Sequence, residues 1–395
     1  MVVIGATILM QILLVGLHRF TKPYGLCRYT ANLFFCLRKV ESLRVTLVLG
    51  EWQKDYYREA LQMDVDDPNV IWVSLRRPAL SRYWWYVWSL PKLARKLNAS
   101  IVHILFPVLI TRRSFACPIV LTMHDLYAYD TPDAIGFPNV FLNRLVLRTC
   151  VGASAAVVSI SYFTRDRLRR WFPELEMRMT LPVIYQEVVV RETRSGTAQL
   201  MAIPAKFLLC VGHHRRNKNL DLTIEAFFKA RDRGVVDDST QLVIVGSEGP
   251  ETHQLRTTAG RRQGVCFLNS IADEHLARLY TSCEALICAS SIEGFCLPVA
   301  EALLFSCRVI CSNIPVLREV AGDQGTYFGL EPRSSDAIVE AISSSMSSNS
   351  HTAGQSRLFT SNPAEEWPKL YAGVLEGHFE SRAIKPKMVS SSSES

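Results

Sequence analysis

Two glutamates separated by seven residues are the side chains whose spacing most clearly suggests chemistry in this sequence. Glu293 and Glu301 follow the apolar run Ala285–Cys288, which is typical of a buried strand. Pro298 suits the first turn of a helix, so we expect a strand, a loop with Glu293 and a helix that carries Glu301 near its start. Open α/β folds bind ligands at this edge of a sheet, beyond the carboxyl ends of the strands. The segment is therefore a candidate binding site.

The backbone between the glutamates adds hydrogen-bond donors to this candidate site. The first amides of a helix have no partner within the helix and attract anionic or polar groups. The carboxylates offer acceptors for hydroxyl groups. A glycosidase needs its two carboxyl groups about 5–10 Å apart around one bond, which a loop residue and a helix residue eight positions later do not obviously provide. Two separate binding roles are favoured, and a loop carboxylate with a helix-dipole partner is the alternative.

A second candidate group is basic. After the apolar run Phe207–Gly212 come His213–Arg216 and then Lys218, so cations are expected where a helix begins and a phosphate can bind. A solvated loop is the alternative for His213–Arg216.

A third candidate group lies in the first half of the chain. His124 and Asp125 follow an apolar run, where they either act on a ligand, with Asp125 orienting His124, or cap the strand by hydrogen bonds. Gly25 lies where the first strand should turn into its helix, and a phosphate can approach the backbone closely there.

The elements that would position these residues alternate between short apolar runs and longer amphipathic segments, as βαβ units and parallel sheets do. The expected strands of the first half are Ile12–Leu17, Val45–Leu49, Val70–Val73, Ile101–Leu105, Ile119–Leu121 and Ala156–Ser159. Those of the second half are Phe207–Gly212, Leu242–Gly246, Val265–Leu268, Ala285–Cys288 and Val309–Cys311. Residues 186–203 form the expected linker. Asn362 and Pro363 open a last helix, and a serine-rich tail follows it.

Composition fits two globular domains. The 395 residues are 48% hydrophobic and 21% charged, which excludes a wholly disordered or fibrous chain. The net charge is +7, with 25 basic and 15 acidic side chains in residues 1–200 against 19 and 22 in the remainder, so the first half is expected to meet something anionic. Eleven cysteines without a CxxC pair argue against disulfides and a zinc site and favour a reducing cytosol.

The apolar stretch Val2–Leu17 is too short to span a membrane and lacks the leading positive charge of a secretory signal. We expect its second part to be a buried strand, and a membrane-dipping segment at residues 1–11 is the alternative.

Taken in order, these segments resemble the motifs of a known family. The two glutamates fall on the E-x7-E signature of retaining glycosyltransferases called group 1 or family 4. The run Phe207–Gly212 is similar to that family's entry to the donor domain. Gly25–Leu33 and Thr122–Leu126 are similar to acceptor-domain motifs of its O-antigen mannosyltransferase-like branch. The resemblance spans about residues 12–378.

The resemblance implies an α/β fold of the GT-B type, in which two Rossmann-like domains with parallel sheets face a central cleft and the C-terminal helix returns to the N-terminal domain. We therefore expect an N-terminal acceptor-binding domain at residues 1–189 with helix 362–378, a donor-binding domain at 190–361 and a disordered tail at 379–395. The donor would be a nucleotide sugar. No metal or other cofactor is expected, so cations and helix amides would stabilise the leaving diphosphate.

The resemblance also implies roles for the matched residues. His124 and Glu293 should lie beside the transferred sugar and Lys218 at the phosphates, as catalytic residues. His213 stands where the family has a phosphate-binding arginine, so Arg215 or Arg216 would have to replace that contact. Cys296 replaces a common glycine, so a positive φ there would cost strain. The expected donor-binding residues are Glu301 at the ribose, His213, Arg215, Gly25, Phe295, Cys296, Leu297 and Gly212.

Aromatic residues in the segment Tyr83–Trp88 are flanked by basic ones. This mixture suits an anionic membrane surface, and a core helix whose aromatics pack on the sheet is an equally weighted alternative. The cluster Arg165–Arg170 with Trp171 and Phe172 adds to the membrane interpretation. Neither segment matches a nucleic-acid motif, so nucleic acid is not an expected partner. The flanking basic residues are Arg76, Arg77, Arg82, Lys92, Arg95 and Lys96.

The expected function is transfer of a hexose, with mannose from GDP-mannose as the leading choice, to a lipid-linked or oligosaccharide acceptor in cell-surface polysaccharide or O-antigen synthesis. The enzyme would be cytoplasmic, with peripheral binding to the inner face of the cytoplasmic membrane as an option. The alternatives are a nucleotide-sugar epimerase of the same fold and a catalytically silent glycan-binding subunit.

Overall fold

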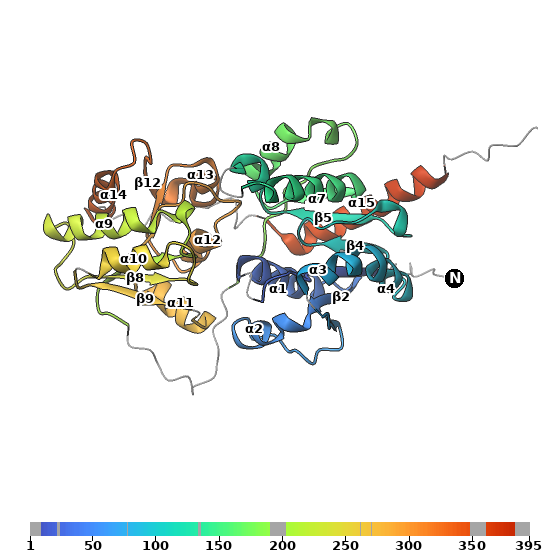
Figure 1. Cartoon of the computed structure of the whole chain (residues 1–395), viewed down its shortest axis with the longest axis horizontal. Helices are drawn as coiled ribbons and strands as arrows, with labels where there is room; N and C mark the ends of the chain where they lie inside the picture. Colours follow the sequence, from blue (N-terminus) through green and yellow to red (C-terminus); the bar gives the residue numbers. More distant parts are fainter. Residues whose placement is uncertain are drawn as a thin grey trace, which may run out of the picture.

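The computed structural model describes residues 9–21, 24–76, 78–132, 136–189, 203–260, 262–269, 271–347 and 361–383. Within these residues the chain forms two six-stranded sheets in which all paired strands are parallel, as predicted. Figure 1 shows the sheets as two halves that lie side by side.

The first sheet has the strand order β3-β2-β1-β4-β5-β6, with β1 near its centre. Ile12 to Val15 of β1 are fully buried, because helices cover both faces of the sheet. Its strands are β1 (Met10–Val15), β2 (Leu43–Gly50), β3 (Val70–Val73), β4 (Ile101–Ile104), β5 (Ile119–Met123) and β6 (Ala156–Ser159). Its helices are α1 (Tyr24–Arg38), α2 (Lys54–Glu59), α3 (Pro78–Trp84), a π-helical turn (Trp85–Ser89), α4 (Leu90–Lys96), α5 (Tyr127–Asp130), α7 (Asn139–Ala153) and α8 (Tyr162–Trp171).

The strand order decides which helices share a face of the first sheet. Parallel crossovers are right-handed, so connections that step in opposite directions along a sheet lie on opposite faces. The steps β1 to β2 and β2 to β3 run one way, which places α1 and α2 together. The steps β3 to β4 and β5 to β6 run the other way, so α3, α4 and α7 share the opposite face. An electrostatic interaction between Tyr86 and Cys150 confirms that the π-helical turn and α7 are neighbours.

The second sheet has the order β12-β11-β10-β7-β8-β9. Eleven of the twelve strands lie where the apolar runs predict them, and the edge strand β12 was not predicted. Its strands are β7 (Phe207–Val211), β8 (Gln241–Val245), β9 (Val265–Leu268), β10 (Ala285–Cys288), β11 (Val309–Ser312) and β12 (Gly325–Phe328). Its helices are α9 (Leu220–Asp232), α10 (Thr252–Ala259), α11 (Asp273–Ser282), α12 (Leu297–Leu304), α13 (Pro315–Ala321) and α14 (Ser335–Ser347).

The last helix, α15 (Pro363–Ala383), returns to the first sheet, as predicted (Figure 1). Trp367 and Tyr371 are fully buried against His103 of β4, with the His103 and Trp367 ring centroids 4.7 Å apart. The helix continues to Ala383, past its predicted end at residue 378. Residues 1–8 of the membrane-dipping alternative, most of the linker and residues 384–395 of the tail lie outside the described residues, whereas Met10 and Gln11 belong to β1. None of the described helices is long and apolar enough to cross a membrane.

A buried chain of hydrogen bonds fixes α15 to the sheet. The Tyr371 hydroxyl lies 2.8 Å from Nδ1 of His103, and Nε2 of His103 lies 2.8 Å from the hydroxyl of Thr122. Burial lowers the pKa of His103 to about 3, so its ring is neutral and carries one donor and one acceptor. The chain needs every member, because a buried polar atom without a partner costs free energy.

Substitution Tyr371→Phe should lower the free energy of unfolding by about 1–2 kcal/mol, because it leaves Nδ1 of His103 buried without its partner. Urea unfolding at neutral pH measures the change. Tyr162→Phe is the control, since Tyr162 is exposed, and its stability should match that of the unsubstituted protein. Equal stability of both variants would contradict the prediction.

Candidate active site

Lys218 and Glu293 form an ion pair at the carboxyl edge of the second sheet. Lys218 ends a 3-10 turn after β7, and Glu293 lies in the loop between β10 and α12. The amide of Ser291 donates to the carbonyl oxygen of Asn217 at 2.8 Å, which holds the two loops together. Burial disfavours the charged ammonium, but Glu293 and the neighbouring thiols outweigh it, so the pKa of Lys218 is raised. Both predicted residues therefore lie together, and the raised pKa keeps the ammonium of Lys218 protonated.

The loop after β7 approaches the loop after β8 so closely that only glycine fits between them. A Cβ atom on Gly246 would lie 1.8 Å from the carbonyl oxygen of Gly212. Gly212 in turn lies against the side chain of Lys218, 3.5 Å from its Cδ and Cε atoms. These glycines place the backbone after β7 beside the lysine, which agrees with the predicted position of Gly212 in the site.

Cys296 adopts the conformation that was expected to be costly. Its φ is 74° and its ψ 72°, in the left-handed region that favours glycine, and it precedes the first residue of α12. Such a residue stores about 1–3 kcal/mol of strain. The conformation lies where the chain passes from the loop that holds Glu293 into α12, whose first residue is Leu297. The hydrogen bond with Cys288 and burial raise the pKa of Cys296, so this thiol is protonated.

Glu301 is buried in α12 and lacks one hydrogen bond. The hydroxyl of Tyr280 donates to its Oε2 at 2.9 Å, while its Oε1 accepts no hydrogen bond among the described residues. Burial raises the pKa of Glu301. A buried carboxylate oxygen without a donor is costly, so this oxygen is poised to accept a hydrogen bond from a ligand hydroxyl.

The first half of the chain reaches Glu301 through Arg28 of α1. The Arg28 guanidinium donates two hydrogen bonds to the Asp273 carboxylate of α11, at 2.9 and 2.6 Å, and its Nε lies 3.5 Å from Oε1 of Glu301. The three groups are mostly buried and join the two halves of the molecule.

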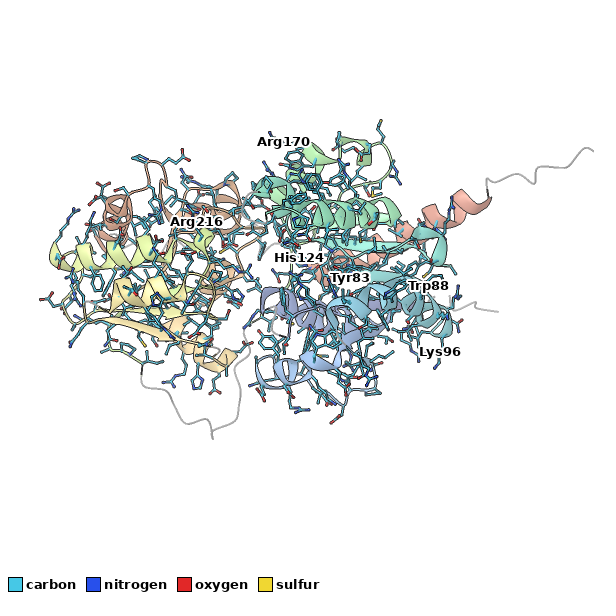
Figure 2. All side chains as sticks on the ribbon, viewed as in Figure 1. Tyr83, Trp88, Lys96, His124, Arg170 and Arg216 are labelled. Atoms are coloured by element: carbon cyan, nitrogen blue, oxygen red, sulfur yellow. The ribbon has the colours of Figure 1, made fainter. Side chains whose placement is uncertain are left out.

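His124 lies between the two halves, as Figure 2 shows. Its Nε2 donates to the carbonyl oxygen of Leu105 at 2.8 Å, and its ring meets that of Tyr29 edge-on at 4.6 Å between centroids. Burial lowers its pKa to about 4, so the ring is neutral at physiological pH.

The hydrogen bond of Asp125 fits the strand-capping alternative, and orientation of His124 by Asp125 stays a prediction. One Asp125 oxygen accepts from the amide of Tyr127 at 3.2 Å, as in the strand-capping alternative. Burial, with Asp130 and Glu293 nearby, raises the pKa of Asp125 to about 6.

The backbones of the two halves meet at Gly294. A Cβ atom on Gly294 would lie 2.0 Å from the carbonyl oxygen of His124. The hydroxyls of Ser161 and Thr164 donate to the Gly294 carbonyl oxygen at 2.6 and 3.2 Å. A narrow cleft beside this contact is lined by residues of both halves, among them Asp125 and Glu293. Asp125 from the acceptor-side segment and Glu293 from the donor-side segment thus line one cleft.

His213 cannot replace a phosphate-binding arginine by charge. Its Nδ1 is hydrogen-bonded to the hydroxyl of Ser247, and burial with the charges of Arg215 and Lys218 lowers its pKa to about 4. Arg215 also influences the pKa of Asp125 in the cleft. Arg215 and Arg216 line a cavity of about 450 Å³ beside α9 and α10. Arg215 is therefore the better placed of the two arginines to supply charge to the cleft.

The remaining predicted residues lie at the helix starts. Gly25 is exposed in the first turn of α1, and nothing lies within 4 Å of where its Cβ would be. Phe295 is buried, with its ring 6.1 Å from that of Tyr185, so its backbone rather than its side chain is available. Leu297 is the first residue of α12.

Sulfur and carboxylate atoms gather next to the ion pair. One atom each from Cys288, Glu293 and Cys296 lie within 4.8 Å of one another, a set that suits a thiophilic metal ion. The carboxylate of this set is already paired with Lys218. The absence of a required metal stays a prediction. All eleven cysteines are free thiols, as the irregular spacing predicted.

Comparison with known families decides the class of the protein. Residues 202–357 match the family described as glycosyl transferases group 1, and residues 24–180 match glycosyltransferase family 4. The chain belongs to the group 1, family 4 glycosyltransferases. It is an enzyme of the glycosyltransferase class, as the E-x7-E signature predicted.

Relatives and solved structures agree with this assignment. The chain is 25% identical over 326 residues to the O-antigen chain mannosyltransferase RfbU of Salmonella typhimurium. The matched segment covers 80% of this chain and 86% of the relative. It is similar in fold to sucrose-phosphate synthase of Thermosynechococcus elongatus, with a TM-score of 0.65, 17% identity and 95% and 98% of the chains covered. Anabaena HepE in complex with UDP and glucose gives a TM-score of 0.59, 16% identity and coverage of 95% and 99%. These structures confirm the GT-B fold.

Sequence reasoning missed Arg28 and Asp273 as members of the site. Arg28 lies in the segment Gly25–Leu33 that resembles a family motif, but Asp273 is 245 residues away, and no local pattern indicates that the two form a pair. A charged residue on the first turns of α1, directly after a candidate phosphate-approach glycine, was the one available signal.

Substitution Gly294→Ala should lower kcat/KM by at least about tenfold, because the new Cβ would collide with the His124 carbonyl oxygen and keep the halves apart. Steady-state kinetics and the affinity for the nucleoside diphosphate are measured on the same variant. If the donor site is intact, this affinity should change less than kcat/KM. Gly373→Ala is the control, as a Cβ there meets nothing within 4 Å. Unchanged kinetics of Gly294→Ala would exclude the close approach.

Proposed function

We propose that this enzyme transfers a hexose, with retention of configuration, from a nucleotide sugar to a lipid-linked glycan acceptor, and that GDP-mannose is the donor in an O-antigen-type synthesis. The observation that carries the donor assignment is the buried Oε1 of Glu301, which accepts no hydrogen bond among the described residues. Glu301 is the second glutamate of the family signature, where the resemblance implies a ribose. A ribose hydroxyl would satisfy it. The similarity to the mannosyltransferase RfbU supports the choice of mannose and of O-antigen synthesis.

The buried pair of Lys218 and Glu293 suits a donor that brings its own charges. A diphosphate attracts the ammonium, while a sugar hydroxyl can donate to the carboxylate. Donor binding would therefore replace the ion pair between Lys218 and Glu293 by two separate contacts. Lys218 would bind the phosphate, and Glu293 would accept a hydrogen bond from the sugar. In the absence of the donor, Glu293 pairs with Lys218 and keeps its ammonium protonated.

Retention can proceed on one face of the sugar. The bond between the anomeric carbon and the phosphate oxygen breaks, the acceptor oxygen forms the new bond on the same face, and its proton passes to the leaving phosphate. Lys218, the first amides of α12 and Arg215 would stabilise the negative charge that develops on the leaving group. His124 is neutral and donates to Leu105, so it would position the sugar rather than accept the proton.

A lipid-linked acceptor requires work at a membrane surface, which we place at the inner face of the cytoplasmic membrane. The free cysteines of this chain suit a reducing cytosol, which borders that face of the membrane. An epimerase would convert the donor without an acceptor, and a silent binding subunit would release no nucleotide at all.

One assay tests the proposal against both alternatives. The protein is incubated with GDP-mannose, other nucleotide sugars and lipid-diphosphate-linked acceptors, and nucleotide release is followed together with the mass of the acceptor. We expect GDP release that depends on the acceptor and a gain of one hexose. Release without a glycosylated acceptor, or no release with any donor, would refute the proposal.

The roles of Glu301 and Lys218 differ in kinetics. Glu301→Ala should raise the donor KM by about tenfold or more, because it removes ground-state binding, whereas Lys218→Ala should mainly lower kcat through the loss of leaving-group stabilisation. Glu340→Ala and Lys206→Ala are the matched controls, since both side chains are exposed away from the cleft. Wild-type kinetics in Glu301→Ala and Lys218→Ala would show that the donor binds elsewhere.

A further inference from the structure

Most exposed large apolar side chains of the first domain lie on two neighbouring helical segments. On α3 and the following π-helical turn they recur every four residues, so they form one stripe along the helix. A second stripe begins just before α7 and continues along it. Each of these side chains is between 56% and 82% exposed. They are Leu80, Trp84 and Trp88 on the first segment and Phe137, Phe141, Leu142 and Leu145 on the second.

The two stripes belong to one surface. The segment α3 to α4 and helix α7 lie on the same face of the sheet, and Tyr86 beneath the first stripe interacts with Cys150 of α7. Both segments follow the carboxyl end of a strand and lead to the amino end of the next one. Leu80 and Phe137 therefore lie nearest the cleft. We call these seven side chains the apolar face.

The two chain segments that carry the apolar face contain no acidic residue. No aspartate or glutamate occurs between Asp67 and Asp125, or between Asp133 and Asp166, so both segments lack acidic residues. Exposed basic residues follow each stripe away from the cleft. They are Lys92, Arg95 and Lys96 on α4 and Arg148 on α7. Figure 2 shows Trp88 and Lys96 on the outer side of the first domain, far from His124.

The other aromatic-basic cluster has a different role. Phe172 is buried, and the Trp171 indole donates to Asp130 at 3.1 Å. Arg167 is bonded to the same carboxylate, and Arg169 to Glu176 at 2.5 Å. The predicted contribution of this cluster to membrane binding is therefore not carried by its aromatics. Trp85 and Tyr86 of the first cluster are also buried, as the core-helix alternative expected, but Trp84 and Trp88 are not.

We infer that the apolar face is a membrane-docking surface for a bilayer with anionic head groups, and that it brings the cleft end of α3 and α7 to the lipid. Exposed aromatics beside cations, without acidic residues, match the interfacial region of such a bilayer. The basic residues would contact head groups while the apolar side chains enter the boundary with the acyl chains. This orientation rests on the proposed lipid-linked acceptor, because it presents the acceptor's sugar to the cleft while its lipid stays in the membrane.

Vesicle binding tests the inference without any need for catalysis. Full-length protein is sedimented with phosphatidylcholine vesicles that contain or lack phosphatidylglycerol. We expect binding that depends on phosphatidylglycerol and weakens with salt. Trp84→Ser with Trp88→Ser, and separately Phe141→Ser with Leu145→Ser, should each weaken it by at least about tenfold.

The charges are tested in the same assay. Replacement of Lys92, Arg95 and Lys96 by Gln should weaken binding to anionic vesicles by about 100-fold, since each basic residue near an anionic surface contributes about fivefold. Met177→Ser is the apolar control, because Met177 is exposed after α8. Arg165→Gln with Arg169→Gln is the charge control, because these partly exposed arginines lie on α8 and not on the apolar face. Both controls should bind like the unsubstituted protein.

Two results would overturn the docking surface. One is vesicle binding that the apolar-face variants leave intact. The other is a dimer in analytical ultracentrifugation that these variants convert to monomers, which would mean that a second copy covers the face. Affinity for GDP, measured on the same variants, should not change. Docking as expected with no donor consumed would refute the proposed function alone, and acceptor-dependent transfer without docking would refute this inference alone.

Discussion

The contact between the Gly294 and His124 backbones is the constraint on which the site depends. It leaves no room for a side chain, and the hydroxyls of Ser161 and Thr164 fix it from the first domain. The loop that makes this contact also carries Glu293 and Cys296. A shift of the loop would therefore move the Lys218 ion pair, the strained turn and the start of α12 together. The positive φ of Cys296 is stable because this packing determines the path of the chain on both sides of it.

Buried charge between the domains is better explained by ligand binding than by stability. Replacing a buried ion pair with apolar residues is often neutral or stabilising, because desolvation offsets the attraction. Here two charged groups meet near one cleft: Lys218 with Glu293, and Arg28 with Asp273 and Glu301. The second contains more carboxylates than cations, and one carboxylate oxygen lacks a donor. A site with that surplus of acceptors suits a ligand rich in hydroxyl groups.

The sequence predicted the fold almost completely, because parallel strands buried on both faces appear as continuous apolar runs. β12 was not predicted because Gly325–Phe328 is an edge strand that contains polar as well as apolar residues. Phe328 is its one buried residue. The site was predictable where a motif is local, as with Glu293 and Glu301. Pairs formed by tertiary structure were not: Lys218 lies 75 residues from Glu293, and Arg28 lies 245 from Asp273. The exposure of Trp84 but not Trp85 depends on which side of one helix meets the sheet, and a run of adjacent aromatics hides that periodicity.

The distribution of charge separates the two substrates. Eight basic residues and no acidic one lie between Asp67 and Asp125, so much of the positive excess of the first half belongs to a stretch that includes α3 and α4. Only Arg28 among the basic residues of that half is bonded into the donor carboxylates in the described part of the chain. Cations that bind the phosphates of a donor would have to lie inside the cleft, where both the cations and the phosphates lose water on binding. A field on the outer helices acts instead on a large anionic surface, and its distance from the cleft leaves the donor site near neutrality. In the arrangement that we propose, the anionic surface contacts the outer helices and the donor contacts the cleft, so membrane binding would not hinder release of the nucleotide.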